Sequence, residues 1–315
     1  RRLRGEFMNI VSIVFGQIVM MFCMMAVGAA AYKAGLITER GSTDLSNITL
    51  FLVIPFVVLT SFQIEFDADI FHGILVTFIL GIAVHAAAIV LSFLLIRGKD
   101  NDRTVLERFS IVYPNCGFMG IPLAQAVLGP KGVIYITAFI AAQNLFIWSH
   151  GAASMQGTFN RGSVKEIFKA PVMIATFAGL FCYLFQIKFP VLIYNPLKAI
   201  ADMNTPLAMI ISGTAIAQTN LLKTLTRPRI YVMTALRLLL MPMVMFLILL
   251  VVPVSKDLKI LSLLASSAST AAITTMFAVK FKKDVGYAAE LFAVSTIAAV
   301  ATLPLMISLG EKFFL

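Results

Sequence analysis

The chain has 315 residues, of which 60% are hydrophobic and 13% are charged, and its mean hydropathy is +0.94. This composition lies far outside the range of soluble globular domains and predicts a polytopic membrane protein, so a nucleic-acid-binding role is not expected. The net charge of +10 matters through the loops that carry it. Cys23, Cys116 and Cys182 all fall in apolar runs and are interpreted as packing thiols, not as disulfide partners.

Apolar runs long enough to cross the hydrocarbon core recur along the whole sequence. Residues 1–7 are expected to derive from cloning, because Glu6-Phe7 is typical of a cloning site and Met8 offers a native start. The rest of the chain predicts an all-α fold of ten transmembrane helices. These spans are expected at 10–32, 46–63, 70–96, 106–129, 132–153, 171–187, 204–219, 229–252, 258–280 and 287–309.

The most polar break in the chain divides the predicted spans into two halves of five. The expected units are a first five-helix repeat at 8–153, a cytoplasmic linker at 154–170 and a second five-helix repeat at 171–315. The halves echo one another, since Pro55 follows Asn47 in the second span and Pro206 follows Asn204 in the seventh. Because five is an odd number, two such repeats must lie in opposite orientations, which is an inverted-topology repeat.

The charges of the loops predict how the chain is oriented. Loops after odd-numbered spans carry most of the basic residues, including Arg40, Arg97, Arg103, Arg161, Lys165, Lys223, Arg227, Lys282 and Lys283. By the positive-inside rule these loops are cytoplasmic and both termini lie outside. The acidic residues Glu65, Asp67 and Asp69 then face outward, which agrees with this orientation.

The stretch from Tyr113 to Pro122 places two prolines and two glycines inside an apolar span. Proline removes a backbone donor and disfavours helix at the residue before it. Lipid offers no partner for a loose backbone group, so such a break is tolerated only where it lines a cavity or is buried in protein. A single proline is often a packing kink, but Pro114, Gly120 and Pro122 together favour a functional helix break.

The ninth predicted span contains a second unusual run, Ser266 to Thr275, which is rich in hydroxyl and small side chains but has no proline. Two interpretations stay open, an unwound turn whose carbonyls are satisfied by hydroxyls or simple close packing of helices. If both spans are broken, each second half-helix begins near the midplane and presents free N–H groups and a partial positive charge. Asn115 would lie at the first of these ends, and the pair would attract a carboxylate or another anion.

Few ionisable residues are predicted to lie deep in the membrane, and none of them is acidic. Arg237 is either a counter-charge for an anionic substrate or a cap for a broken helix. His85 either carries a proton or is merely hydrogen-bonded. The amide pair Gln143 and Asn144 must find partners inside the bundle. Without a deep carboxylate, cation transport lacks an obvious carrier, and the positive potential favours an anion.

The sequence P-N-C-G-F-M-G-I-P-L from Pro114 to Leu123 resembles the first crossover of the auxin efflux carrier family, which includes plant PIN-FORMED carriers and bacterial permeases of malonate or malate type. The match extends to Asn144 with Trp148, and to Leu303-Pro304. The resemblance implies a secondary transporter with a scaffold and a mobile crossover domain that move by an elevator mechanism, commonly as a homodimer. The short linker fits a bacterial-type member in the inner membrane.

The resemblance also implies where the substrate binds. The contacts that it implies are Asn115 at the first crossover, Asn144 in the fifth span, and Ile54 and Val58 beside the proline of the second span. The predicted substrate-binding set also includes Pro114, Cys116 and Gly117 at the first crossover, Gln143 in the fifth span, and Ser269 and Thr270 in the hydroxyl-rich run. Plant members have prolines in the second crossover where this chain has Thr270 and Thr275, and they carry a charged pair on the scaffold that has no counterpart here. No metal site and no cofactor are expected.

The leading prediction is a carrier of a small organic anion, a mono- or dicarboxylate or an auxin-like acid. One alternative is a sodium-coupled symporter of bile-acid type, which would need an oxygen-rich cation site built from Gln125, Ser269 and Thr270. Another is a membrane sensor that binds a ligand without transporting it. An enzyme is not expected, because the chain has no His-Glu-x-x-His motif and no paired deep aspartates.

Overall fold

The computed structural model describes residues 2–98, 101–157, 169–220, 224 and 226–314. The regular elements in these ranges are helices, accompanied by one isolated antiparallel bridge. Seven helical segments are long and apolar enough to cross a membrane, judged by length and composition. The structure therefore supports a polytopic helical membrane protein, whereas the exact number of ten spans remains a prediction.

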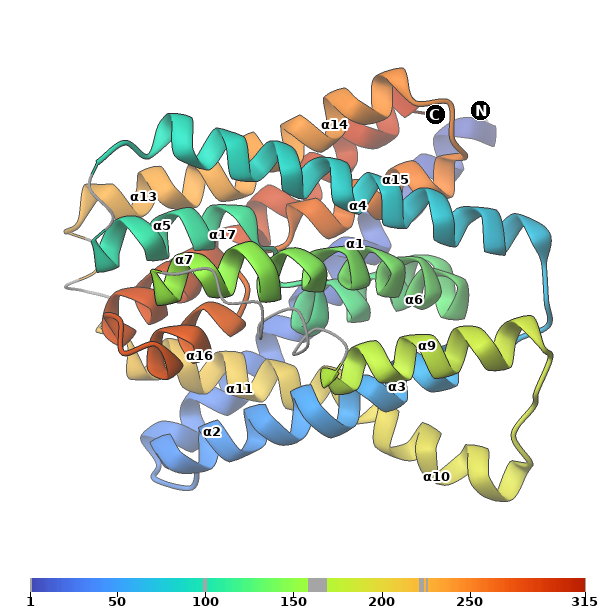
Figure 1. Cartoon of the computed structure of the whole chain (residues 1–315), viewed down its shortest axis with the longest axis horizontal. Helices are drawn as coiled ribbons and strands as arrows, with labels where there is room; N and C mark the ends of the chain where they lie inside the picture. Colours follow the sequence, from blue (N-terminus) through green and yellow to red (C-terminus); the bar gives the residue numbers. More distant parts are fainter. Residues whose placement is uncertain (1, 99–100, 158–168, 221–223, 225, 315) are drawn as a thin grey trace.

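The helical elements follow one another in two series on either side of the linker (Figure 1). The first series is α1 (Arg2–Lys33), α2 (Glu39–Ile48), η1 (Thr49–Val53), α3 (Ile54–Ser61), α4 (Ala68–Leu95), α5 (Asp102–Val112), η2 (Cys116–Gly120), α6 (Ile121–Phe146), η3 (Ile147–Gly151) and α7 (Ala152–Gln156). The second is α9 (Pro171–Leu184), α10 (Val191–Asp202), α11 (Asn204–Gln218), α13 (Pro228–Ala235), η4 (Leu236–Leu240), α14 (Met241–Val251), α15 (Lys256–Ser267), α16 (Ile273–Lys280) and α17 (Val285–Phe314). Each η element is a single wider, π-helical turn that continues into the α-helix after it.

Several boundaries differ from the predicted ones for local reasons. The helix expected at 46–63 begins earlier, at Glu39, because Thr38 caps it by accepting a hydrogen bond from the Gly41 N–H. Helix α10 forms where the sequence predicted only a connection. The boundary expected near residue 130 falls at Gly129, where φ is 60° and ψ is −146°, followed by Pro130. The linker expected at 154–170 lies largely outside the described residues.

Close contacts between small residues hold the two series together. Helix α1 packs along α11, and α3 packs along α9. A Cβ atom on Gly213 would lie 1.9 Å from the Met25 carbonyl oxygen, and one on Gly28 would lie 2.2 Å from the Ile210 carbonyl oxygen. Only glycine permits this backbone approach, which is how helices without a hydrophobic driving force between them pack in a membrane.

Both chain termini lie at the same end of the bundle, at the right in Figure 1. The connections from α3 to α4, from α9 to α10 and from α14 to α15 lie at this end as well, while those from α1 to α2 and from α4 to α5 lie at the opposite end. The connection from α3 to α4, which holds Glu65 and Asp67, is thus at the opposite end from the starts of α2 and α5, which hold Arg40 and Arg103, as the sequence predicts. The structure contains no membrane, so which end faces the cytoplasm remains a prediction.

Two helices are interrupted in the middle of the bundle, and their interruptions cross. The chain leaves helical geometry between α5 and η2, and again between α15 and α16. Pro114 and Thr270 form an antiparallel bridge, in which the Asn115 N–H donates to the Ser269 carbonyl (2.8 Å) and the Ala271 N–H donates to the Tyr113 carbonyl (3.0 Å). Each interruption therefore satisfies backbone groups of the other. Residues 113–115 and 268–272 are called the crossing below.

Candidate functional site

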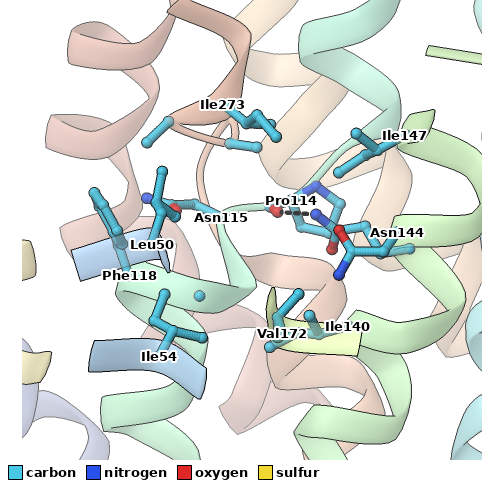
Figure 2. A pocket seen from close by; sticks show the side chains of 14 residues that line it. Leu50, Ile54, Pro114, Asn115, Phe118, Ile140, Asn144, Ile147, Val172 and Ile273 are labelled. Atoms are coloured by element: carbon cyan, nitrogen blue, oxygen red, sulfur yellow. Dashed lines mark hydrogen bonds between the residues drawn. The ribbon is translucent and has the colours of Figure 1, made fainter. Parts of the chain in front are cut away.

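A cavity of about 90 Å³ lies beside the crossing (Figure 2). The wall is formed by the two interrupted helices together with η1, α3, α6, η3 and α9. The lining residues are Leu50, Ile54, Pro114, Asn115, Gly117, Phe118, Ile140, Gln143, Asn144, Ile147, Val172, Ala271, Ala272 and Ile273. No charged side chain is among these described lining residues, so the polar groups of the cavity are amides and backbone groups.

Three amide side chains supply the polar part of the cavity. Asn115 and Asn144, both more than nine-tenths buried, lie on opposite sides of the space in Figure 2. The Gln143 Nε2 donates to the Pro114 carbonyl (2.9 Å), which the break in the helix leaves without an intrahelical partner. The buried Gln143 Oε1 has no partner within the described part of the chain. An unpaired buried amide oxygen is costly, so this position is suited to accept a hydrogen bond from a ligand or water.

Two helix N-termini point their dipoles at the same region. The segment η2–α6 starts at Cys116, directly after Asn115, and α16 starts at Ile273. The first N–H groups of a helix have no intrahelical partner, and the aligned peptide dipoles place a partial positive charge there. Converging N-termini of this kind can hold an anion without a cationic side chain.

Of the residues predicted to bind substrate, the cavity gathers Pro114, Asn115, Gly117, Gln143, Asn144 and Ile54. Gly117 lies against Ile54, since a Cβ on Gly117 would be 3.2 Å from the Ile54 Cδ1. This contact joins η2, which follows the crossing, to α3.

The other predicted contacts lie outside the lining. The Cys116 Sγ donates to the Ala265 carbonyl (3.5 Å), and Val58 is fully buried one turn beyond Ile54. The Ser269 Oγ accepts from the Thr296 Oγ1 (3.1 Å), and the Thr270 Oγ1 donates to the Ser110 carbonyl (3.3 Å). Ser269 and Thr270 thus hold the crossing together, and Ala271, Ala272 and Ile273 take their expected place at the cavity.

The predicted break residues have different roles. Pro114 lies in the interruption itself, whereas Gly120 and Pro122 lie in the helix that resumes after it. A Cβ on Gly120 would be 2.6 Å from the Ile136 Cδ1, so Gly120 allows close packing. Pro122 stands directly after the π-helical turn η2, inside the continuous helix that starts at Cys116.

Arg237 is buried behind the crossing and has the contacts of a cap. Its Nη1 donates to the Ile111 carbonyl (2.7 Å), its Nε donates to the Ala268 carbonyl (3.1 Å), and its Nη2 donates to the Ser266 carbonyl. These carbonyls belong to the C-terminal ends of α5 and α15, where intrahelical donors run out. A cation also complements the negative ends of both helix dipoles.

His85 lies near Arg237, around a space of about 10 Å³ that Pro114 also borders. Its Nδ1 is 2.6 Å from the Gly81 carbonyl, and its ring stacks on Phe146. The Nε2 has no partner in the described part of the chain. His85 is thus positioned behind the crossing and does not line the cavity, which leaves its proposed proton role open.

The sequence comparison decides the family. The family model described as "Membrane transport protein", that of the auxin efflux carriers and PIN-like proteins, matches residues 13–307. The chain belongs to this family. A search of curated sequences finds no match to the chain. The resemblance seen at the crossover motif is therefore confirmed, and membership supports a transporter, not an enzyme.

For this member of the family, sequence reasoning missed most of the apolar wall of the cavity. Leu50, Phe118, Ile140, Ile147 and Val172 give no sequence signal, because each is an ordinary apolar residue in an apolar span. Among the described residues, no group of three or more His, Cys, Asp or Glu side chains is arranged to hold a metal ion.

Proposed function

We propose that the protein is a secondary active transporter of a small organic anion, whose carboxylate binds at the crossing. The observation that carries this proposal is the cavity between Asn115 and Asn144, at which two helix N-termini converge. Its lining has no carboxylate that would repel an anion or bind a cation. Amide donors and helix dipoles together offer a carboxylate hydrogen bonds and partial positive charge.

The apolar wall supports an organic substrate in preference to an inorganic anion. Ile54, Phe118, Ile140 and Ile273 surround the polar groups (Figure 2). Burial of apolar surface stabilises a bound ligand by about 25 cal/mol per Å². A carboxylate carried on an apolar body, such as an auxin-like acid, uses both parts of the cavity, while a small dicarboxylate uses mainly the polar part.

The arrangement of helices is consistent with two inverted repeats that move by an elevator mechanism. Helix α1 opens the first series and packs against α11 of the second, and α9 opens the second series and packs against α3 of the first. This reciprocal packing is what a pseudo-two-fold axis requires. A second cavity, of about 210 Å³, lies where α6 meets α3, α10 and α11. It is lined by Asn204, whose buried amide has no partner among the described residues. We infer that this is a solvent path along the interface between scaffold and mobile domain.

The proposed location is a plasma membrane, specifically a bacterial inner membrane, with both termini outside and a homodimer as the assembly. The basic loops support the orientation through the positive-inside rule. The sodium-coupled alternative gains no support from the site, since Gln125 lines the second cavity whereas Ser269 and Thr270 are engaged within the crossing.

The decisive experiment measures currents from proteoliposomes on a solid-supported membrane in sodium-free buffer, after jumps of malonate, malate and indole-acetate. We expect a saturable current, and we expect Asn115→Ala to lower the apparent affinity for the substrate at least tenfold. The reason is that a hydrogen bond to a charged group contributes about 1.5–3 kcal/mol. Asn195→Ala, an exposed asparagine on α10, is the matched control and should behave as the native protein.

Other outcomes separate the alternatives. A saturable current unchanged by Asn115→Ala contradicts the proposed site. A current that appears only with sodium identifies the symporter. Binding of a labelled acid to the protein without accumulation in vesicles identifies the sensor.

A further inference from the structure

A separate cluster of charged residues lies at the end of the bundle where α5, α13 and α17 begin (Figure 1). Its floor is the buried carboxylate of Glu107. The Arg229 Nε donates to the Glu107 Oε1 (3.0 Å) and its Nη2 to the Oε2 (2.7 Å), and the Tyr287 hydroxyl also donates to the Oε1 (2.8 Å). Glu107 is therefore neutralised from within the cluster and ties three helices together.

Above this floor the positive charge is in excess. The Arg227 Nη1 donates to the Glu290 Oε2 (2.6 Å). The guanidinium carbon of Arg103 lies 5.4 Å from the centre of the Tyr287 ring, and no carboxylate of the described residues lies within ion-pair distance of it. The lining of the cavity thus holds three guanidinium groups and one carboxylate, and Arg103 is the one of the three that has no carboxylate partner among the described residues.

These residues surround a cavity of about 390 Å³, with Arg103, Glu107, Arg227, Arg229 and Tyr287 in its wall. Helix α13 begins at the same cavity with Pro228 in its first turn and no side-chain cap. Its N-terminus adds a partial positive charge to that of the guanidinium groups. The cavity therefore combines space, a planar hydrogen-bond donor and excess positive potential, which together suit an anion with several oxygens.

The cavity lies at the starts of two candidate membrane spans, the position at which lipid headgroups are expected. Two candidate membrane spans, Pro228–Val251 and Val285–Phe314, begin at its edge. The loop charges predict that this end is cytoplasmic, and the cytoplasmic leaflet is the one that is rich in anionic lipid. Basic pockets between transmembrane helices at this level bind phosphate-bearing headgroups.

We propose that the cavity between α5, α13 and α17 binds a phosphate-bearing anion at the membrane surface, with Arg103 as the residue that pairs with the phosphate. Guanidinium groups hold phosphate oxygens through two parallel hydrogen bonds. Bound there, the anion neutralises the excess charge and joins the starts of the three helices. The site is distinct from the crossing and does not depend on the transported substrate.

The test titrates the purified full chain in detergent and follows its thermal unfolding midpoint. The probes are phosphatidylglycerol against phosphatidylcholine in mixed micelles, and inorganic phosphate against chloride at equal ionic strength. We expect phosphatidylglycerol to raise the midpoint, and Arg103→Gln to weaken its apparent affinity about fivefold, because the variant loses one direct guanidinium–phosphate contact. Arg103→Lys should retain part of the effect, and the exposed Arg40→Gln should retain all of it.

The lipid probe and the inorganic phosphate probe together distinguish the source of the phosphate. Stabilisation by phosphatidylglycerol that depends on Arg103 identifies a lipid headgroup, and an Arg103-dependent shift with inorganic phosphate alone identifies a soluble ligand. The proposal is overturned if neither probe stabilises the protein, or if Arg103→Gln and Arg40→Gln lose the same amount. Arg103→Gln breaks no ion pair, so its fold is expected to survive and is checked by its midpoint without additives.

Discussion

Arg237 is a single side chain on which both interrupted helices depend. Each interruption leaves carbonyls at the end of a half-helix without intrahelical donors, in a region with no bulk water to replace them. The guanidinium provides donors in a fixed fork, and it reaches carbonyls of Ile111, Ser266 and Ala268 at once. Its charge is thereby spread over the negative ends of two helix dipoles, which explains how an arginine is accommodated so deep in the bundle.

Replacing Arg237 with methionine should therefore destabilise the protein by about 3 kcal/mol or more, because several buried carbonyls lose their donors together. Lysine should be intermediate, since an ammonium keeps the charge but lacks the planar fork. Thermal unfolding in detergent measures the difference, read by a thiol-reactive dye in a background without Cys23 and Cys182, so that the dye reports exposure of the buried Cys116. Arg40→Met controls for loss of one positive charge, and equal midpoints for all variants would show that Arg237 is not a cap.

The individual site residues differ in how far the sequence predicts them. Pro114 and Asn115 were predictable, because proline chemistry acts locally and breaks a helix wherever the chain places it. The choice between cap and counter-charge for Arg237 was not, since it depends on carbonyls more than a hundred residues away in one case. The side chains of Ser269 and Thr270 were expected at the cavity, but they form hydrogen bonds within the bundle at the crossing. Their direction is set by the pairing of the two interruptions, which the sequence does not show.

Among the helices, the contact of α1 with α11 is the one most tightly set by residue size. Gly213→Ala places a Cβ within 1.9 Å of the Met25 carbonyl oxygen, so the helices must separate. Overpacking of this kind costs about 1–3 kcal/mol, and we expect a lower unfolding midpoint and a smaller yield of folded protein. Gly16→Ala on α1 is the matched control, because nothing lies within 4 Å of its added Cβ. That variant should be neutral or slightly stabilised, and equal losses in both would contradict the close-contact explanation.

The elements were predictable to the extent that local chemistry marks them. Gly129-Pro130 marks a boundary in the sequence, and the structure departs from helix at Gly129. The interruption after Ser267 has no proline, and it forms because Tyr113, Asn115 and Ser295 provide hydrogen-bond partners from elsewhere in the chain. Helix α10 was not predicted, although its own sequence forms it. It is amphipathic and, with 12 residues, too short to be recognised as a membrane span of its own, and it packs against α3.

At the level of the whole molecule, the distribution of charge and the placement of chain ends lead to the same orientation. Both termini share one end of the bundle with the connection that holds Glu65, Asp67 and Asp69 (Figure 1). The starts of α2, α5 and α13, with the basic residues Arg40, Arg103 and Arg229, lie at the other end. If each half holds five spans, as the sequence predicts, the two halves lie in opposite orientations and the even total returns the C-terminus to the side of the N-terminus.

This orientation predicts the side from which single cysteines are labelled. In a background without native cysteines, Glu65→Cys should react with a membrane-impermeant maleimide in intact bacterial cells, and Arg40→Cys should react only after permeabilisation or in inverted vesicles. Both positions are exposed, Glu65 in the connection before α4 and Arg40 in the first turn of α2, so the difference reports the side of the membrane and not burial. The reverse pattern would overturn the positive-inside assignment, and it would move the phosphate-binding cavity to the outer leaflet. Labelling of both cysteines from outside would contradict the alternation of loops between the two ends, and with it the inverted repeat.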